Sequence, residues 1–308
     1  MNHPTLKTDP ILMVRDAEKS YGQVRALRGA SFDLYPGELL GFLGPNGAGK
    51  TTMIRCLAGR AQLDSGTLTY NPDRIVGDEL PGVVPQSLAI YNDLTALQNL
   101  RAFGRLHGLR GMHLDDRIVE ALEWSNLTDR ADQLAKTFSG GMKRRLNIAC
   151  SVLHEPQILL LDEPTVGVDP QSRERIYEML RELCARGTSI LLTTHQLDEA
   201  QYRCDRIAIV DEGRVIHSGT FQQLLADTVG QHQQLNVQFA SRLAIAPPGF
   251  QLSATGETAT ATLSQSANEL SEVMRSVESC GQPVRSIKLE SPKLQHVFLH
   301  LTGRELRE

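Results

Sequence analysis

A glycine-rich segment that joins an apolar run to a helix-compatible stretch constrains the fold of this chain more than any other feature. The apolar run Leu39–Leu43 leads into Gly44-Pro45-Asn46-Gly47-Ala48-Gly49-Lys50-Thr51, and the residues from Lys50 to Leu57 favour a helix. The segment fits the pattern G-x-x-x-x-G-K-[ST]. In this pattern glycines let successive backbone N–H groups turn towards a phosphate, and the following helix points its positive N-terminal end at the same charge. The sequence therefore predicts a phosphate-binding loop between a strand and a helix.

Residue types within this loop match the chemistry of a nucleoside triphosphate. Lys50 is expected to reach the β- and γ-phosphates, and the Thr51 hydroxyl is expected to bind Mg²⁺. The expected nucleotide-binding residues of the loop are Gly44, Pro45, Asn46, Gly47, Ala48, Gly49, Lys50, Thr51 and Thr52. The alternative is a chance glycine turn, which average residue usage makes a roughly one-in-a-hundred event in a chain of this length. Alone, the motif indicates only a P-loop nucleotide hydrolase.

Two adjacent acids end a second apolar run, Ile158-Leu159-Leu160-Leu161-Asp162-Glu163. If the run is a strand of a parallel sheet, both carboxylates lie at the carboxyl end of the sheet, beside the phosphate loop. Asp162 can then hold Mg²⁺ or its water ligands. Glu163 can accept a proton from an attacking water or orient it, and general-base help of this kind contributes typically about 10²–10⁴-fold. Two solvated acids at a strand end are the alternative.

Three further elements fit either a nucleotide site or ordinary structure. Phe138-Ser139-Gly140-Gly141-Met142 places a serine and two glycines at the start of a helix, which is an anion site or merely a capped helix start. His195 follows the apolar run Ile190–Leu192, and Gln86 ends the segment Val83-Val84-Pro85-Gln86. Taken singly, His195 is more often structural than catalytic, and Gln86 is more often a polar loop residue.

The chain divides into a long α/β part and a short C-terminal segment. From Gln157 to Ile216, apolar runs typical of strands buried on both faces alternate with polar helical stretches. The region from about 87 to 155 is richer in helix formers, and Thr95 is expected to cap one of the helices. We therefore predict an α/β nucleotide-binding domain over residues 11–230, with a helical subdomain at about 87–155, and a small α+β domain over residues 231–308.

Composition excludes several classes of protein. The formal net charge of −4 at pH 7 gives no sign of a nucleic-acid-binding surface. No apolar run approaches the about 20 residues that a membrane-spanning helix needs. The five cysteines are scattered and form no C-x-x-C, which indicates reduced thiols in the cytosol rather than disulfides or a metal site.

The order of the elements is more specific than any one of them. The phosphate loop is followed by Gln86, Ser139-Gly140-Gly141, Asp162-Glu163, Asp169 and His195. Over about residues 11–220 this order resembles the ATP-binding cassette of ABC proteins, because other P-loop nucleotide hydrolases lack the Ser-Gly-Gly element just before the Asp-Glu strand. The resemblance implies a RecA-like α/β core with an antiparallel β subdomain and an inserted helical subdomain.

The resemblance also implies a role for each matching residue. Tyr21 matches the aromatic residue that stacks on adenine. Gln86 matches the glutamine that touches Mg²⁺ and the attacking water and senses the transmembrane partner, and His195 matches the switch histidine at the γ-phosphate. The residues implied as Mg²⁺ ligands are Thr51, Gln86 and Asp162, and those implied as catalytic are Glu163, His195 and Gln86.

A second set of matches implies that two chains share each site. Ser139, Gly140, Gly141 and Met142 match the signature that grips the γ-phosphate of ATP held by the other subunit, and Asp169 lies in the dimer-contact loop. Phe138, Met142 and Val168 stand where leucine, glutamine and leucine are usual. None of these departures removes a phosphate ligand, since the signature acts through the serine and backbone amides, so ATP hydrolysis is still expected. One loop and one signature per chain favour a symmetric homodimer.

The function expected from the resemblance is to power export with ATP and Mg²⁺. A separately encoded transmembrane permease would be the partner, facing the helical region, and no nucleic acid is expected. The chain would lie at the cytoplasmic face of the cell (inner) membrane, held there through the permease. Met142 and the segment Leu294–Glu308 resemble ATPases of drug, lipo-oligosaccharide and polysaccharide exporters. The alternatives are an importer ATPase, a soluble ABC ATPase acting on ribosomes or nucleic acid, and a non-hydrolysing regulator, which the intact Glu163 disfavours.

The C-terminal segment has patterns of its own. Leu235, Val237 and Phe239 alternate like a strand, as do Ile287 and Leu289, and Ser266 with Glu269 forms a capping box. Two apolar helix faces are expected, one made of Leu270, Val273, Met274 and Val277 and the other of Leu294, Val297, Phe298 and Leu301. We expect the segment to bury its own apolar faces and to stabilise the dimer or modulate coupling without doing chemistry. The second helix face is expected at a contact with the ATP-binding part or a second copy, or in the segment's own core.

Overall fold

The computed structural model describes residues 9–71, 73, 81–230, 232–263, 267–304 and 306. Contacts divide the chain into two compact units. The first unit comprises Met1–Gly219 with Leu306–Glu308, and the second unit comprises Thr220–Glu305. The domain boundary predicted at residue 230 differs from this division by helix α7 (Phe221–Asp227), which groups with the second unit.

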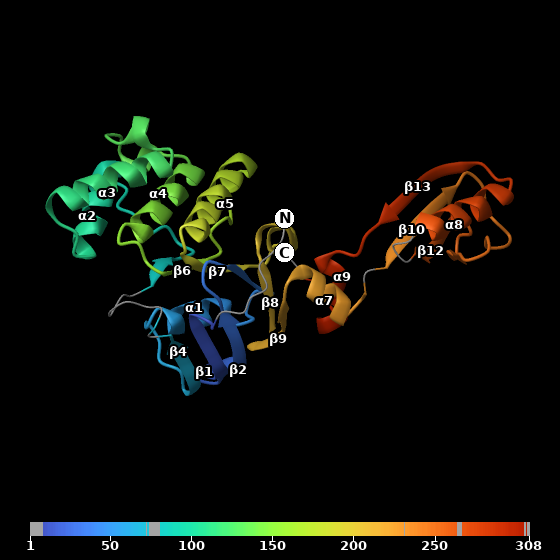
Figure 1. The fold of residues 1–308 in the computed structure, drawn as a ribbon, viewed down its shortest axis with the longest axis horizontal. Helices are drawn as coiled ribbons and strands as arrows, with labels where there is room; N and C mark the ends of the chain where they lie inside the picture. The colour runs from blue at the N-terminus through green and yellow to red at the C-terminus, as the bar shows by residue number, and fades with distance from the viewer. Residues whose placement is uncertain are drawn as a thin grey trace. The chain divides into compact units, whose positions relative to one another are not determined.

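A six-stranded sheet lies at the centre of the first unit, counted over the described residues, in the order β5-β6-β7-β3-β8-β9 (Figure 1). Its strands are β3 (Leu39–Leu43), β5 (Gly82–Val84), β6 (Ile158–Asp162), β7 (Ser189–Thr194), β8 (Arg206–Asp211) and β9 (Arg214–Gly219). β5 to β8 run parallel, and β9 pairs antiparallel with β8. Every residue of β3, β6 and β7 is buried, which confirms the prediction of strands covered on both faces.

Two cores cover the central sheet, one on each face. Leu40 and Leu160 pack in a cluster with α1 (Lys50–Leu57) and the antiparallel sheet β2-β1-β4. The strands of that sheet are β1 (Leu12–Tyr21), β2 (Val24–Leu34) and β4 (Ser65–Tyr70). Leu159 and Leu161 pack on the opposite face with α5 (Pro170–Ala185), and α6 (Leu197–Arg203) contacts β3 and β7. Neighbouring residues of β6 therefore face different cores, as alternation along a strand requires.

A helical subdomain is inserted between β5 and β6 (Figure 1). It contains α2 (Ala96–Leu106), α3 (Gly111–Trp124), α4 (Gly140–Val152) and the 3₁₀ turns η1 (Thr128–Arg130) and η2 (Ala135–Thr137). These helices bury a core of their own around Leu100, Ile118 and Leu146. Thr95 caps α2 as predicted, in a capping box with Gln98. This subdomain carries the Ser139-Gly140-Gly141 element at the start of α4.

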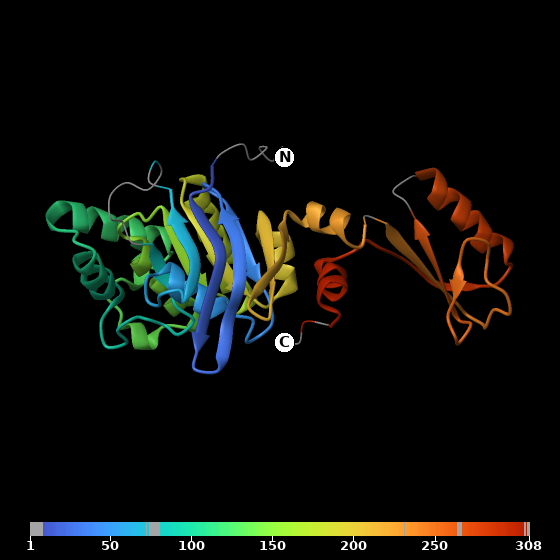
Figure 2. The same cartoon turned by 90° about the horizontal axis from the view of Figure 1, so that it is seen from below.

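The second unit contains an antiparallel sheet of four strands among the described residues, in the order β11-β12-β10-β13. The strands are β10 (Gln233–Phe239), β11 (Gln251–Leu252), β12 (Thr258–Leu263) and β13 (Val284–Glu290). Figure 2 shows α8 (Ala267–Ser279) lying along one face of this sheet. The predicted apolar face of α8 packs with Leu235, Val237 and Phe239, so both patterns are confirmed. Ser266 of the expected capping box lies outside the described residues.

Strand β13 is an exception to the expected burial. Ile287 and Leu289 pair across the sheet with Val237 and Leu235, so they lie on the face that α8 covers. They are nevertheless 44% and 45% exposed. The reason is position, because β13 is an edge strand and the apolar cluster under α8 is built from β10 and β12. The expectation that the segment buries its own apolar faces was therefore wrong at this edge.

The last helix, α9 (Leu294–Thr302), buries the face that its spacing predicted. Leu294, Val297 and Phe298 are buried and Leu301 is half-buried. α9 packs against α7 within the second unit. α7 lies within residues 11–230, which the predicted bounds assigned to the ATP-binding part, so this face is buried against a helix outside the predicted segment 231–308 and outside the cluster under α8.

Candidate functional site

The phosphate loop lies between the end of β3 and the first turn of α1. Gly49 precedes α1 with φ of 97°, and a Cβ there would lie 2.4 Å from the carbonyl oxygen of Ala26. Only glycine fits such a position. Lys50 is 5% exposed, and its Nζ donates to the carbonyl oxygens of Gly44 at 2.8 Å and Pro45 at 3.1 Å. A buried cation thus lies beside a helix N-terminus, an arrangement that can hold phosphate.

A cavity of about 700 Å³ opens beside the loop. Its lining includes residues predicted from separate parts of the sequence, namely Tyr21, Asn46, Gly47, Gly49, Lys50, Thr51, Thr52, Gln86 and Glu163. Arg25, Arg28 and Arg55 also line it, and the sequence analysis missed them. No motif marks these arginines; the hairpin of β1 and β2 and the first helix bring them to the cavity. Their positive charge suits an anionic ligand.

The Glu163 carboxylate is the meeting point of the predicted catalytic residues. Its Oε1 lies 3.3 Å from Lys50 Nζ and 3.0 Å from His195 Nδ1, and its Oε2 accepts a hydrogen bond from Gln86 Nε2 at 3.2 Å. Glu163 is 7% exposed and has a left-handed φ of 48°, which is uncommon for a residue other than glycine. Burial lowers the pKa of Lys50, and the nearby Glu163 carboxylate opposes that shift. The structure therefore brings Lys50, Gln86, Glu163 and His195 together.

Thr193 holds both acids in place and was not found from the sequence. Its Oγ1 donates to Asp162 Oδ1 at 2.7 Å and accepts from the backbone N–H of Glu163 at 3.0 Å. Thr193 lies directly opposite Asp162 in the register between β7 and β6. A threonine at the end of an apolar run is the only signal in the sequence, and it gains meaning once those two strands are known to be neighbours.

Asp162, Thr51 and Gln86 line a smaller cavity of about 340 Å³. All three carry side-chain oxygens, which are the ligands that Mg²⁺ prefers. Within the described part of the chain, no three His, Cys, Asp or Glu residues are grouped so that they could hold a metal by themselves. A cation here would therefore take most of its ligands from water and phosphate, as Mg²⁺ does at nucleotide sites. The donor set fits Mg²⁺.

The signature residues form a different part of the surface. Ser139 caps α4, and its Oγ accepts from the N–H of Met142 at 3.2 Å. A Cβ on Gly141 would lie 2.1 Å from Ser172 Oγ, so glycine allows the starts of α4 and α5 to touch. Asp169 caps α5 by accepting from the N–H of Ser172, and these hydrogen bonds lower the pKa of Asp169. The signature segment 138–142 contributes none of the described residues that line the two cavities beside the phosphate loop.

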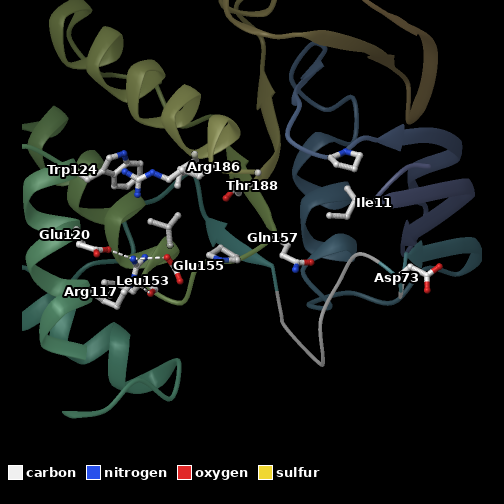
Figure 3. Close-up of a pocket in the computed structure, with 16 residues that line it drawn as sticks. Ile11, Asp73, Arg117, Glu120, Trp124, Leu153, Glu155, Gln157, Arg186 and Thr188 are labelled. Carbon is white, nitrogen blue, oxygen red and sulfur yellow. Dashed lines mark hydrogen bonds and ion pairs between the residues drawn. The ribbon is translucent and has the colours of Figure 1, made fainter. Parts of the chain in front are cut away.

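A further cavity, of about 550 Å³, lies at the opposite end of the central strands, where β6 and β7 begin (Figure 3). It is lined by Gln157 and Thr188, which immediately precede β6 and β7, whereas Glu163 and His195 follow those strands. Figure 3 shows Arg117 between two carboxylates, at 2.9 Å from Glu155 and in contact with Glu120. This cavity lies between the helical subdomain and the sheet and shares no lining residue with the nucleotide cavities.

Among the described residues, no helix is long and apolar enough to cross a bilayer.

Named relatives from other organisms align with almost the whole chain. The linearmycin resistance ATP-binding protein LnrL of Bacillus subtilis is 37% identical over 97% of this chain and 100% of its own length. The daunorubicin resistance ATP-binding protein DrrA3 of Streptomyces coeruleorubidus is 38% identical over 97% of this chain and 98% of its own. The Nod factor export ATP-binding protein I of Ralstonia nicotianae is 37% identical over 99% and 98%. These alignments include the second unit.

The solved structures cover a smaller share of this chain than the named relatives do. An ATP-binding subunit of an ABC transporter has a TM-score of 0.62 and 29% identity, covering 70% of this chain and 92% of its own. The cbiO1 protein of Clostridium perfringens, part of an ABC transporter complex, has a TM-score of 0.64 and 27% identity over 71% and 92%. A dimeric ATP-binding cassette bound to ADP and Pi has a TM-score of 0.60 and 25% identity over 68% and 98%.

The family model described as ABC transporter matches residues 27–166, from β2 past the Asp162-Glu163 pair. Together with the relatives that align end to end, this match confirms the fold and the ATPase activity that the motifs predicted. This chain belongs to the exporter-type ATP-binding proteins of ABC transporters, which are ATPases.

Proposed function

We propose that this chain binds Mg²⁺-ATP beside the phosphate loop, hydrolyses it with Glu163 as the general base, and drives export through a separate membrane-spanning subunit. One observation carries the proposal. The Glu163 carboxylate contacts Lys50, Gln86 and His195 at a cavity lined by the phosphate loop. The groups needed to bind a phosphate and to activate a water therefore meet at one point.

The contact between Lys50 and Glu163 suggests the order of events. The Lys50 ammonium lies 3.3 Å from the Glu163 carboxylate and neutralises it. When the γ-phosphate enters the loop, the Lys50 ammonium turns to the phosphate oxygens, and the carboxylate becomes free to accept a proton from water. The water oxygen bonds to the γ-phosphorus as the bond to the β–γ bridging oxygen breaks, and ADP leaves with that oxygen. Gln86 orients the water, and His195 contacts the γ-phosphate.

Thr51, Gln86 and Asp162 would hold Mg²⁺, which supplies positive charge to the phosphates when bound. Thr193 keeps Asp162 and the backbone of Glu163 in register while this happens. The ring of Tyr21, 45% exposed at the cavity, is proposed to stack on the adenine. Tyr21→Ala should then raise the Michaelis constant for ATP more than it lowers the maximal rate, since base stacking is worth roughly 1–3 kcal/mol in nucleic-acid complexes. An unchanged Michaelis constant would remove Tyr21 from the site.

Two substitutions test the chemistry. Lys50→Ala should weaken nucleotide binding because a charged contact to the phosphates is lost. Glu163→Gln should keep ATP bound and abolish turnover. Glu212→Gln is the matched control, because Glu212 is another acid of the same cavity but pairs with Arg28 at 3.7 Å. Nucleotide binding and phosphate release are measured on each protein. Near-normal turnover in Glu163→Gln would refute the assigned role.

We further propose that two copies share each ATP, with the signature of one facing the phosphate loop of the other. Two observations support this: the signature lines neither nucleotide cavity of its own chain, and a similar cassette is known as a dimer with ADP and Pi. Glu163→Gln with ATP and Mg²⁺ should shift from monomer to dimer in chromatography with light scattering, and Ser139→Arg should block the shift by filling the anion site. A Ser139→Arg protein that dimerises and hydrolyses normally would refute the shared site.

Export and its partner are proposed from the relatives, whose names refer to drug resistance and Nod factor export. The chain would act at the cytoplasmic face of the membrane, held there by the permease. The cavity of Figure 3 is a candidate place for that contact, since one of its sides, with Glu120 and Arg117, belongs to the helical region that we expect to face the permease. Glu120→Lys should reduce co-purification with the membrane subunit while ATP hydrolysis by the isolated chain is kept. An importer ATPase or a soluble ABC ATPase is not favoured.

A further inference from the structure

Helix α4 carries a buried polar face that belongs to none of the sites described above. Arg144, Asn147 and Ser151 are spaced by three and four residues, so they lie on one side of the helix. They are 5%, 1% and 8% exposed. Buried polar side chains are found where they have hydrogen-bond partners to satisfy. The partners of this face therefore show what the helix holds.

All three side chains bind the backbone of the segment that runs from Val83 in β5 to Ala89, which includes Gln86. Ser151 Oγ donates to the carbonyl oxygen of Val83 at 3.0 Å. Arg144 donates from Nη1 to the carbonyl oxygen of Pro85 at 2.9 Å and from Nη2 to that of Gln86 at 2.7 Å. Asn147 Oδ1 accepts from the N–H of Ala89 at 3.3 Å. The helix thus fixes this segment on both sides of Gln86.

Gln86 needs such support because it lies outside regular structure. β5 ends at Val84, and residues 86–89 are exposed. The side chain of Gln86 nevertheless reaches Glu163 Oε2 at 3.2 Å. The two bonds from Arg144 are the ones that hold the backbone at Gln86 itself. The Asp162 carboxylate acts on Arg144 as well, since it opposes the lowering of the Arg144 pKa by burial.

We infer that Arg144 is a positioning residue for Gln86, and that it makes the placement of Gln86 depend on the placement of α4. The inference rests on the proposed roles of Gln86 and Glu163. The N-terminus of the same helix carries Ser139, Gly140 and Gly141. The same helix therefore carries the signature at its start and, further along, the side chain that holds the backbone at Gln86.

A double-mutant cycle between Arg144→Lys and Gln86→Ala tests this in the full-length chain. Lysine keeps the charge but lacks the planar fork that reaches two carbonyl oxygens at once. Arg144→Lys should lower kcat about ten-fold or more, because small misplacements at an active site have effects of this size. It should leave the dissociation constant for ATP within about three-fold, since Lys50 and Tyr21 are untouched. The double variant should be no slower than Gln86→Ala alone, because Arg144 acts through Gln86.

Arg145→Lys is the matched control on the same helix. Arg145 also donates to two backbone carbonyls, those of Ser125 and Asn126, but these lie in the helical subdomain away from Gln86. Its effect on kcat should be small and should multiply with that of Gln86→Ala. If Arg144→Lys fails to fold, as judged by circular dichroism, the same cycle is run with Asn147→Ala, which releases Ala89.

Three results would overturn the inference, and a fourth concerns only the proposed function. A double variant slower than Gln86→Ala by the full factor of Arg144→Lys overturns the inference, as does an unchanged kcat in Arg144→Lys. Equal behaviour of Arg144→Lys and Arg145→Lys in the cycle would also overturn it, because it would assign both arginines to general stability. Failure of the proposed function would appear elsewhere, as turnover in Glu163→Gln.

Discussion

The central sheet of the first unit and the sheet of the second unit differ in sequence pattern and in how they are covered: the first has continuous apolar runs, and the second has strands in which apolar and polar residues alternate. In β3, β6 and β7 every residue is buried, and separate cores lie on the two faces. In the second unit, β10 buries alternate residues under α8, and the edge strand β13 leaves Ile287 and Leu289 nearly half exposed.

The difference shows where precision is needed. Asp162 and Glu163 stand at the end of a strand that cannot shift without disturbing two cores at once, and Thr193 on the neighbouring strand fixes their spacing. The second unit carries none of the predicted nucleotide residues and has one covered face. Three leucine-to-alanine substitutions, in β6, β10 and β13, compare the two sheets with the same chemical change.

Leu160→Ala should have the largest effect. Leu160 is fully buried two residues before Asp162, so its loss should cost about 2–5 kcal/mol of unfolding free energy and should displace Asp162 and Glu163. Urea unfolding and phosphate release, measured on the same protein, should both fall. A protein that is destabilised but hydrolyses ATP at the normal rate would break the link between the double cover of β6 and the site.

Leu235→Ala should come next and should act on stability alone. Leu235 is 1% exposed in β10, and its removal should cost a similar about 2–5 kcal/mol within the second unit. Because the two units are compact on their own, unfolding should show a separate early transition. ATP binding should be kept, as measured by nucleotide fluorescence. Loss of binding in the folded variant would place the second unit in the nucleotide site.

A chain ending at Gly219 should show a smaller change. It keeps all the predicted nucleotide residues, so it should bind ATP, while dimerisation or transport becomes weaker. Light scattering with the hydrolysis-deficient Glu163→Gln background measures the dimer. Loss of all nucleotide binding in a soluble, folded protein would show that the division between the two units is wrong.

Leu289→Ala should have the smallest effect. Leu289 is 45% exposed at the edge of the sheet, and surface substitutions usually change stability by less than about 0.5 kcal/mol. Urea unfolding at low protein concentration checks this value. A loss as large as that of Leu235→Ala would mean that β13 is covered in solution and that the two sheets are more alike than described.

Much of the fold could be predicted because its strands are either fully apolar or strictly alternating. The run Ile158–Leu161 and the alternation Leu235–Phe239 both predicted strands. The exposure of Ile287 and Leu289 could not be predicted, because it depends on sheet order. The sequence carries a signal next to the division at Gly219, because Thr220 and Gln223 form a capping box that starts α7.

The site follows the same division between local pattern and tertiary arrangement. Lys50, Glu163 and the signature lie in contiguous motifs, so their types and spacing reveal them. Arg144 and Thr193 act on residues far away in the sequence, and their roles depend on which helix and which strand lie next to Gln86 and Asp162. Such supporting residues are legible only when the neighbours of a strand are known.

The contact between Lys50 and Glu163 means that the Glu163 carboxylate competes with a phosphate for the Lys50 ammonium. The ammonium has an anionic partner in the Glu163 carboxylate, so the free energy gained when it meets the phosphate is a difference between two ionic contacts and not the whole of one. Removing the carboxylate should therefore tighten the binding of a non-hydrolysable nucleotide as well as stop the reaction. Glu163 would then set both the affinity of the site for ATP and the rate at which bound ATP is hydrolysed.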